Sequence, residues 1–177
     1  MIKPLFTVLL LSLLCVFNTN AQNEPNEPVA DTIHKVGEVL NGPLESIVPP
    51  AGFDTISYFN GYLNRKTGAS ILINEIHEVG FFQLESGMND AYYSANGMEF
   101  ISKCELKTVS GTNGMIYKMR FKQSGIPFIR YVVHAGDITH TLWLHVTYAE
   151  RFEEELDAGI LKSFESIDFY PMSAEER

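Results

Sequence analysis

Apolar and polar positions alternate along the second half of the chain. Three such runs, at 115–121, 126–134 and 138–148, are separated by short turns. Alternation with a period of two is typical of a strand that buries one face. Residues 69–77 alternate in the same way, with both faces partly apolar. The sequence therefore predicts an antiparallel sheet built largely as a meander.

Helical spacing of apolar residues predicts helices before and after these strands. The longest spans 150–164, where apolar residues share one face and acidic residues gather in the first turns, next to the positive end of the helix dipole. Two short helical segments lie between Gly80 and Gly97, and another spans 29–40. An antiparallel meander flanked by helices places the chain in the α+β class.

Proline, glycine and asparagine divide the region between the first helix and the first long strand. We expect brief strands at 44–48 and 55–59, a turn from Pro49 to Phe53, and a loop or hairpin between Asn60 and Gly68. After the last helix, residues 165–169 are expected to return as a final strand.

The first 21 residues have the pattern of a secretory signal peptide. Lys3 precedes an apolar run at 5–17, and small residues then offer a cleavage site before Gln22. The run is shorter than the roughly 20 residues that span a bilayer, which disfavours an uncleaved anchor. Leu14 stands directly before Cys15, which disfavours lipidation because a lipoprotein signal has a small residue there. We therefore expect an exported protein, periplasmic or extracellular.

The rest of the chain is expected to form one domain behind a tether. Residues 22–30 are polar and proline-rich and contain almost nothing to bury, so they predict a flexible segment. Residues 31–177 predict a single α+β domain. About 150 ordered residues bury roughly 68 to 70% of the unfolded surface, which is enough for folding without disulfide bonds.

Net charge and cysteine content exclude some functions. The whole chain has a formal net charge of -9, and removal of the leader takes Lys3 and no acid. An acidic surface opposes binding to nucleic acid, whose phosphates require a positive field. The same cleavage leaves Cys104 alone, so no intramolecular disulfide forms, and this cysteine is expected to be a small buried hydrophobe.

Catalytic motifs are absent from the sequence. No Gly-x-Ser-x-Gly pentapeptide occurs, and the segment 111–114 lacks the Gly-Lys-Ser/Thr ending of a phosphate loop, so it predicts a hairpin turn with Asn113 and Gly114 at its tip. His77 and Glu78 begin a zinc-protease motif, but Phe81 stands where the second histidine belongs. We therefore assign no catalytic residue and no cofactor-binding residue.

Three histidines fall within one predicted hairpin. His140 and His145 are separated by an odd number of positions, so a regular strand points them to opposite faces. If Gly136 and Asp137 form a two-residue turn, His134 and His140 also diverge. We therefore expect no metal site shared by the three, although a β-bulge would reverse one of these orientations.

The arrangement of glycine, proline and apolar residues resembles that of the PsbP-like and DcrB-like group. The resemblance rests on Val48 to Phe53, on Gly68 to Ile71, on Ser110 to Met115, and on Tyr148 leading into the acidic helix, and it covers 44–169. It implies an α/β/α sandwich around an antiparallel sheet. Members of the group are accessory proteins without common catalytic residues, so the resemblance informs fold more than function.

Three function classes remain open. The first is a non-enzymatic accessory or protein-binding module that docks on another envelope or secreted protein; it predicts an exposed apolar or charged patch without a cavity. The second is a small-ligand-binding protein with a pocket of several hundred Å³ between sheet and helices. The third, less favoured, is a hydrolase with a non-standard site.

One strand offers a candidate contact surface. Alternate positions of 115–121 are apolar and basic, which is unusual in an acidic protein. With the two-residue turn assumed above, Arg130 faces Trp143, and the guanidinium stacks on the indole. The candidate patch for an acidic partner is Lys118, Arg120, Lys122, Arg130 and Trp143. The alternative is that these bases pair with acids of neighbouring helices.

We expect the mature protein to begin at Gln22, because the apolar run is short and a cleavage site follows it. N-terminal sequencing of protein recovered outside the cytoplasm measures this directly. Recovery of envelope protein that still carries residues 1–21 contradicts the assignment.

Overall fold

The alternating segments form one antiparallel sheet in the computed structural model, which describes residues 37–169. Eight strands are present in this range: β1 (Val39–Asn41), β2 (Asp54–Thr55), β3 (Gly61–Asn64), β4 (Ala69–His77), β5 (Glu99–Lys107), β6 (Asn113–Gln123), β7 (Ile126–Gly136) and β8 (His140–Ala149). The α-helices of this range are α1 (Phe81–Gly87), α2 (Asp90–Ala95) and α3 (Glu153–Phe164), and short 3-10 helices occupy Leu44–Ser46 and Glu150–Phe152. The predicted α+β class is confirmed.

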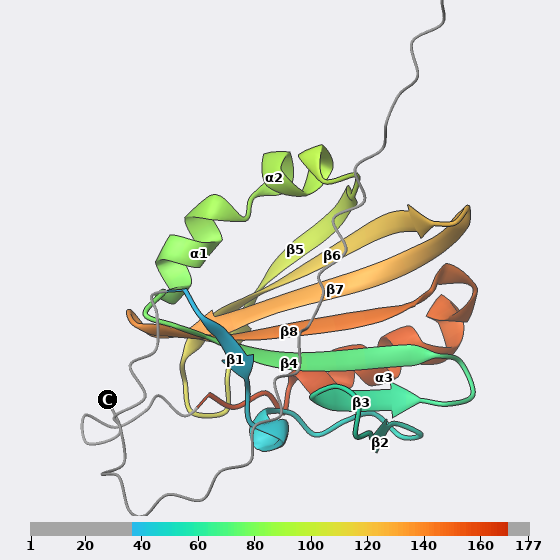
Figure 1. Cartoon of the computed structure of the whole chain (residues 1–177), viewed down its shortest axis with the longest axis horizontal. Helices are drawn as coiled ribbons and strands as arrows, with labels where there is room; N and C mark the ends of the chain where they lie inside the picture. The colour runs from blue at the N-terminus through green and yellow to red at the C-terminus, as the bar shows by residue number, and fades with distance from the viewer. Residues whose placement is uncertain (1–36, 170–177) are drawn as a thin grey trace, which may run out of the picture. The chain divides into compact units, whose positions relative to one another are not determined.

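The sheet has the order β2-β3-β4-β8-β7-β6-β5, and β1 also pairs with β4. Strands β6 to β8 form the meander that the alternation predicted, and β5 extends it as a further antiparallel strand paired with β6. Strand β8 then pairs with β4, from His77 opposite His140 to Ser70 opposite Thr147. This contact joins the meander to the N-terminal part of the sheet (Figure 1).

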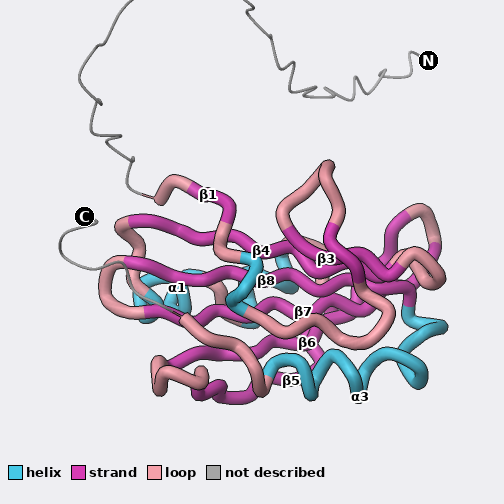
Figure 2. The backbone as a smooth tube through the Cα atoms, turned by 90° about the horizontal axis from the view of Figure 1, so that it is seen from below, coloured by secondary structure: helices cyan, strands magenta, loops and turns pink. Residues whose placement is uncertain are grey.

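One face of the sheet packs against α3, which runs lengthwise along the strands (Figure 2). The helix buries Leu156, Ile160 and Phe164, and Tyr131 packs edge-on against Phe164 with ring centroids 5.3 Å apart. The sheet contributes alternate residues of its central strands to this core: Ile71, Ile73, Ile129, Val133, Leu142, Leu144 and Val146. The helical spacing at 150–164 therefore predicted both the helix and its buried face.

A carboxylate fastens α3 to the sheet. The Asp157 carboxylate accepts hydrogen bonds from the hydroxyls of Tyr131, at 2.6 Å, and Tyr148, at 2.7 Å. The Lys118 ammonium lies 3.0 Å from the same carboxylate and 2.7 Å from that of Glu153. Five polar side chains of α3 and of the sheet thus meet above the apolar core and satisfy one another.

Helices α1 and α2 lie on the other face of the sheet (Figure 1). The first turn of α1 is fixed by a hydrogen bond from the Phe81 N–H to the Asp137 carbonyl, at 2.8 Å. Gly80 precedes the helix because a Cβ there would lie 2.5 Å from the Ile138 carbonyl oxygen. This close approach sets the position of α1 over the sheet.

Several expected elements differ from the structure. Of the helix expected at 29–40, the described residues 37–40 form a turn and the start of strand β1, and residues 29–36 lie outside the described range. Residues 44–48 contain a 3-10 helix rather than a strand, and the strand expected at 55–59 is the two-residue β2. The Pro49 to Phe53 turn is confirmed, since the Phe53 N–H donates to the Pro50 carbonyl.

Two further differences concern the ends of the meander. Residues 165–169 form no strand; after a turn, single hydrogen bonds join this segment to Ser46 and Val109. Strand β5 was not predicted, because an edge strand exposed along most of its length shows no alternation. The turn before β6 lies at 108–112, so Asn113 and Gly114 begin the strand instead of forming the tip of the turn.

The described residues, 37–169, all belong to one compact unit. The expected signal peptide at 1–21 and tether at 22–30 lie outside the described range. Within 37–169, none of the helices has the length and apolar character needed to span a bilayer.

Replacement of Asp157 by Asn is expected to lower the free energy of unfolding by about 1–3 kcal/mol at pH 7, because the hydroxyls and the ammonium lose a charged acceptor. Burial raises the pKa of Asp157, but the hydrogen bonds from Tyr131, Tyr148 and Lys118 outweigh it, so the pKa is lower than usual. A lowered carboxyl pKa stabilises the fold above about pH 3.9 and loses this effect in more acidic solution.

Urea unfolding of Asp157→Asn and wild type at pH 7 and pH 3 tests this. The difference between the two proteins is expected to be smaller at pH 3 than at pH 7. The exposed Glu154 on the same helix supplies the matched control, Glu154→Gln, which is expected to behave as wild type. A constant difference between Asp157→Asn and wild type at both pH values contradicts the charged role.

Candidate functional site

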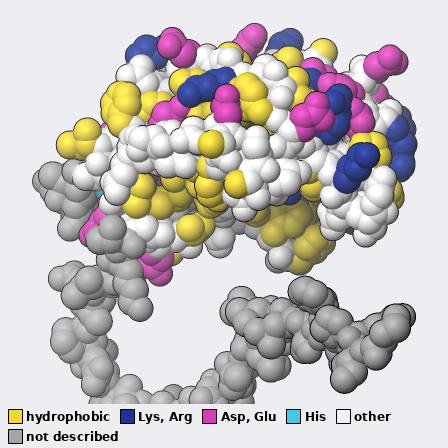
Figure 3. Space-filling model, turned by 90° about the horizontal axis from the view of Figure 1, so that it is seen from above, with side chains coloured by type: hydrophobic (Ala, Val, Ile, Leu, Met, Phe, Trp, Pro, Cys, Tyr) yellow, Lys and Arg dark blue, Asp and Glu magenta, His cyan; other side chains and the backbone are white. Residues whose placement is uncertain are grey.

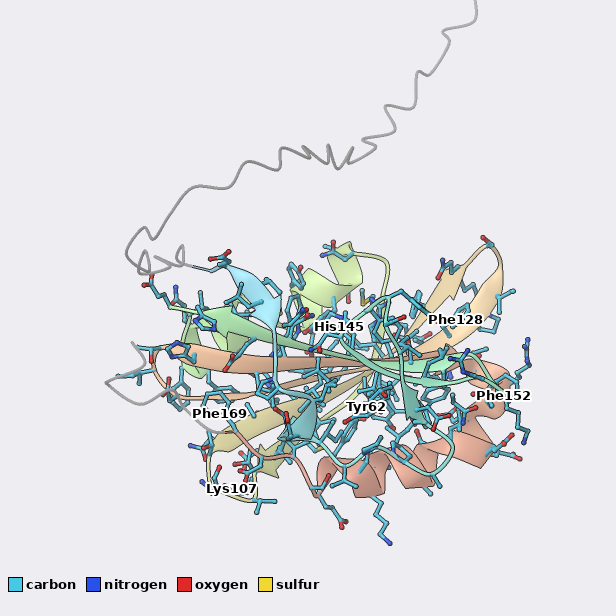
Figure 4. The ribbon with its side chains drawn as sticks, turned by 60° about the horizontal axis from the view of Figure 1, so that its bottom comes forward. Tyr62, Lys107, Phe128, His145, Phe152 and Phe169 are labelled. Atoms are coloured by element: carbon cyan, nitrogen blue, oxygen red, sulfur yellow. The ribbon has the colours of Figure 1, made fainter. Side chains whose placement is uncertain are left out.

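Two histidines and the single tryptophan of the sequence lie together on the α1–α2 face of the sheet. Met115 of β6 stands opposite His134 of β7, which stands opposite Trp143 of β8. His145, two residues after Trp143, points to the same face over the middle of the sheet (Figure 4). Ring centroids are 6.3 Å apart for His134 and Trp143, and 4.4 Å apart for Trp143 and His145.

Methionines and aromatic rings surround this row. All four methionines of the described residues belong to the cluster: two come from β6, and the other two lie in the segments before and after α2. Its members, together with Trp143, are Met88, Met98, Met115, Met119, Tyr93, Phe100, Tyr117 and Val132. Tyr117 and Met119 are fully buried. The second core is therefore soft and polarizable, unlike the isoleucine- and leucine-rich core beneath α3.

Several buried polar atoms in this layer have no hydrogen-bond partner among the described residues. His134 is 0% exposed, and neither of its ring nitrogens is bonded. The other atoms are Nε2 of His145, Nε1 of Trp143, the hydroxyl of Tyr93 and one carboxylate oxygen of Glu85. Because each such group costs about 1–3 kcal/mol, their collection in one layer requires a physical reason.

The acidic member of the layer is held by two partners. Glu85 of α1 accepts a hydrogen bond from the Tyr117 hydroxyl and forms an ion pair with Lys103 of β5. The Lys103 ammonium also lies 5.1 Å from the centre of the Tyr117 ring. Burial, and then the hydrogen bond to Glu85, raise the pKa of Tyr117, so its hydroxyl remains a donor at neutral pH.

Both histidines of the cluster are neutral at physiological pH. Burial, and then the charge of Lys103, lower the pKa of His134 to about 4. Burial, and then the charge of Arg130, lower the pKa of His145 to about 4. Each neutral imidazole keeps one N–H donor and one nitrogen lone pair, so both rings can bind a polar group or a soft metal.

A groove of about 500 Å³ opens beside the cluster. Phe81 and Phe82 of α1 line one part of the groove. The ends of β5 and β6 line the rest, through Glu105, Leu106, Lys107, Asn113, Gly114 and Met115. Met115 belongs both to the groove and to the buried row, where it stands opposite His134. One side chain, Met115, thus lines the groove and is also the cross-strand neighbour of the unpartnered imidazole.

The candidate basic patch is not formed as expected. Lys118 is paired with Glu153 and Asp157, and the Arg120 guanidinium lies 2.6 Å from Glu150 and 3.2 Å from Glu99. Figure 3 shows basic side chains next to acidic ones on the face it draws. The alternative prediction, that these bases pair with neighbouring acids, is correct for Lys118 and Arg120. Lys122 lies exposed near the end of β6.

Arg130 and Trp143 are separated from the other members of the patch and from each other. Arg130 stands opposite Met119 and so projects from the face opposite Lys118 and Arg120. Its partner on β8 is Thr147, and its guanidinium lies 4.6 Å from the centre of the Phe121 ring. The predicted Arg130–Trp143 stacking is wrong because the turn between β7 and β8 is longer than two residues.

The predicted orientations of the histidines are confirmed, although the two-residue turn assumed for them is not. His140 lies on the α3 face of the sheet, whereas His134 and His145 lie on the other face. The His140 ring packs against His77, with ring centroids 4.6 Å apart. Within 37–169, no three His, Cys, Asp or Glu side chains converge as metal ligands. The same counting of positions places His134 and His145 on one face, a consequence that sequence reasoning did not draw. Cys104 is exposed, not buried.

Replacement of His134 by Leu is expected to leave stability at pH 7 unchanged or higher, because the buried imidazole has no partner to lose. A histidine whose pKa falls on folding destabilises the folded state as pH drops below about 6.5. With a folded pKa of about 4, His134 accounts for about 3 kcal/mol of the loss by pH 4.

Denaturant unfolding at pH 7 and pH 4 measures both effects. The loss of stability on acidification is expected to be smaller in His134→Leu than in wild type. His140→Leu is the control, since the His140 ring has a partner in Thr139 at 3.0 Å and its loss should destabilise the protein. An equal acid-induced loss in wild type and His134→Leu overturns the assignment.

Comparisons with known proteins find similarity at the level of structure. No protein-family profile matches the chain, and no curated protein matches its sequence. The solved structure of a Pseudomonas aeruginosa protein of unknown function, described as a putative regulator, is similar with a TM-score of 0.45 and 9% sequence identity. The match covers 81% of this chain and 90% of that one.

Proposed function

We propose that this chain is an exported, non-enzymatic binding protein that holds a small ligand between its sheet and helices α1 and α2. The observation that carries the proposal is the set of unpartnered polar atoms, led by both nitrogens of the fully buried His134, beside a groove of about 500 Å³. Ligand sites are typically apolar hollows of about 300–1,000 Å³ with a few convergent polar groups.

The composition of the layer supports binding over simple packing. A structural core satisfies its polar groups or omits them, whereas this one combines imidazole, indole, phenol and carboxylate atoms that lack partners. Methionine side chains adapt their shape to a bound molecule at little cost. The expected ligand is small and largely apolar or polarizable, with few polar contacts.

The side chains of the layer suit binding more than catalysis. No serine, cysteine or threonine nucleophile belongs to the described cluster, and the carboxylate of Glu85 is held by Tyr117 and Lys103. Export follows from the leader pattern at 1–21. A PsbP-like α/β/α sandwich is our proposed fold, supported by helices packed over both faces of the sheet.

A docking function is the second candidate, and one observation favours it. Three large apolar side chains at one end of the sheet are well exposed: Phe82 by 67%, Val109 by 67% and Ile138 by 83%. The β5–β6 and β7–β8 connections share this end of the antiparallel sheet, and α1 begins beside it. Such side chains suit an apolar segment of another envelope or secreted protein.

The groove is expected to bind 1-anilinonaphthalene-8-sulfonate, an apolar fluorescent probe, at one site per chain. Phe82→Lys is expected to weaken this binding by about tenfold or more, because the variant removes an apolar wall. Phe82 is largely exposed, so the melting temperature should not change.

Probe titration by fluorescence, with thermal melts of each protein, makes the measurement. Tyr58→Lys is the matched control, because Tyr58 is 71% exposed and does not line the groove. Ile138→Lys should also bind the probe as wild type does, because Ile138 does not line the groove. If the probe instead binds the exposed apolar end of the sheet, as a docking function alone predicts, Ile138→Lys weakens probe binding. Wild-type affinity in Phe82→Lys contradicts a ligand groove at this position.

A further inference from the structure

A half-buried arginine on the α1–α2 face of the sheet has no acidic partner. The Nε–H of Arg130, on β7, donates to the Thr147 hydroxyl at 3.2 Å. No carboxylate of the described residues forms an ion pair with this guanidinium. Its two terminal nitrogens have no hydrogen-bond partner in this part of the chain, and neither is fully buried. Four N–H donors of a charged group are therefore open to a partner.

The lack of an acid distinguishes Arg130 from the other half-buried bases of residues 37–169. Those bases are Lys118 and Arg120, and both are paired with carboxylates. Burial lowers the pKa of Arg130 and no acid offsets this effect, but a guanidinium stays charged at neutral pH. Removing a charge from water is unfavourable unless a counter-charge replaces the lost hydration. The position of Arg130 therefore favours the binding of an anion.

Aromatic rings hold the guanidinium in place. Its central carbon lies 4.6 Å from the centre of the Phe121 ring. Phe121 stacks in turn on Phe128, with ring centroids 5.5 Å apart and an angle of 24° between the ring planes. Contact with a ring occupies the face of a guanidinium and leaves the N–H groups at its edge available. With Nε bonded to Thr147, the terminal nitrogens can donate two parallel hydrogen bonds to one carboxylate.

The surroundings of Arg130 are an open part of the sheet. In the strand register, Ser70 of β4, Thr147 of β8 and Arg130 of β7 follow one another in a single row. Phe121 and Phe128 face each other beside this row, toward the β6–β7 hairpin, over which neither α1 nor α2 is drawn in Figure 1. All five side chains are half-exposed. We call these five residues the Arg130 surface.

The openness of this surface favours a segment of another protein over a small ligand. A small-molecule site encloses roughly 70–90% of its ligand, whereas the Arg130 surface is a half-exposed sheet face. Arg130 also does not line the groove beside α1. Arginine and aromatic side chains are common anchors at protein interfaces. The combination of one unpaired guanidinium with two phenylalanine rings suits an acidic side chain that has an apolar neighbour.

We propose that the Arg130 surface docks a partner protein through an aspartate or glutamate side chain with an apolar residue beside it. The carboxylate accepts hydrogen bonds from the terminal nitrogens of Arg130, and the apolar residue covers Phe121 and Phe128. The formal net charge of -9 repels an acidic partner at a distance, so recognition rests on this local pair. The surface is separate from the groove of the proposed function, and neither site depends on the other.

Two matched peptides test the pairing on the unaltered protein. The probe is an acetylated and amidated tripeptide of leucine, glutamate and phenylalanine, and the control peptide has glutamine in place of glutamate. Each is titrated into the ¹⁵N-labelled mature chain, residues 22–177, and followed by ¹H–¹⁵N NMR. The glutamate peptide is expected to shift the Arg130 Nε–H signal and the backbone amide signals of Phe128 and Thr147 until they saturate. The uncharged glutamine peptide should bind at least about tenfold more weakly.

Variants locate the contact. Arg130→Met keeps an unbranched side chain but removes the guanidinium, and it is expected to weaken binding of the glutamate peptide by more than about tenfold. Its melting temperature should not fall, because no ion pair is lost. Lys122→Met removes the same charge from the same hairpin, but Lys122 is exposed on the opposite face, so this control should bind as wild type does. Phe82→Lys, which alters the groove, should also bind the peptide normally, so the two proposals fail separately.

The docking surface is overturned if millimolar glutamate peptide causes no saturable shift, if the glutamine peptide binds equally well, or if Arg130→Met binds as wild type does. Sodium acetate that shifts the Arg130 signal as strongly as the peptide would overturn the apolar part of the contact. Peptide-free shifts that grow with protein concentration and vanish in Arg130→Met would identify a second copy as the occupant instead. Tighter peptide binding after Glu24→Gln and Glu27→Gln would identify the chain's own acidic segment, and it too would overturn the partner.

Discussion

The pairing of β4 with β8 is the interaction on which the rest of the structure depends. These strands lie about 70 residues apart in the sequence, yet they pair continuously from Ser70 to His77. Helix α1 follows β4 and crosses one face, whereas α3 follows β8 and covers the other. The same contact therefore joins the two parts of the sheet and sets the helices on opposite sides. Forming it requires closure of a long loop, which makes it an entropically costly step in folding.

The two faces of the sheet differ in how their polar groups are treated. On the α3 face, Asp157 collects two tyrosine hydroxyls and an ammonium, and each of these groups is satisfied. On the α1–α2 face, histidine nitrogens are buried without partners among the described residues. The polar groups on the α3 face are hydrogen-bonded, whereas several on the α1–α2 face are not. The unbonded groups lower the stability of the folded state, as is common where a protein keeps groups for function.

Sequence periodicity predicted the elements better than their register. The alternation in β6, β7 and β8 and the helical face of α3 were all visible, because each buries one side. The β7–β8 turn was assumed too short. The Asp137 carboxylate accepts hydrogen bonds from the N–H groups of Thr139 and His140, and so builds a longer loop from local side-chain bonds that apolar patterning does not reveal. That change moved Trp143 from Arg130 to His134.

Only the part of the candidate site that lies on neighbouring strands of the meander could be predicted from the sequence. Position counting along β7 and β8 places His134 and His145 on a common face, and the alternation of β6 places Met115 there too. Glu85 and Tyr93 reach the site from α1 and α2, and no sequence period indicates where those helices cross the sheet. Strand β5 also bears on how copies of this chain meet. It is a long edge strand, but its register shifts between Phe100 and Ser102, and it carries Lys103 and Lys107. A kinked, charged edge is a poor template for a second strand, so the sheet ends here without recruiting another chain into a growing aggregate.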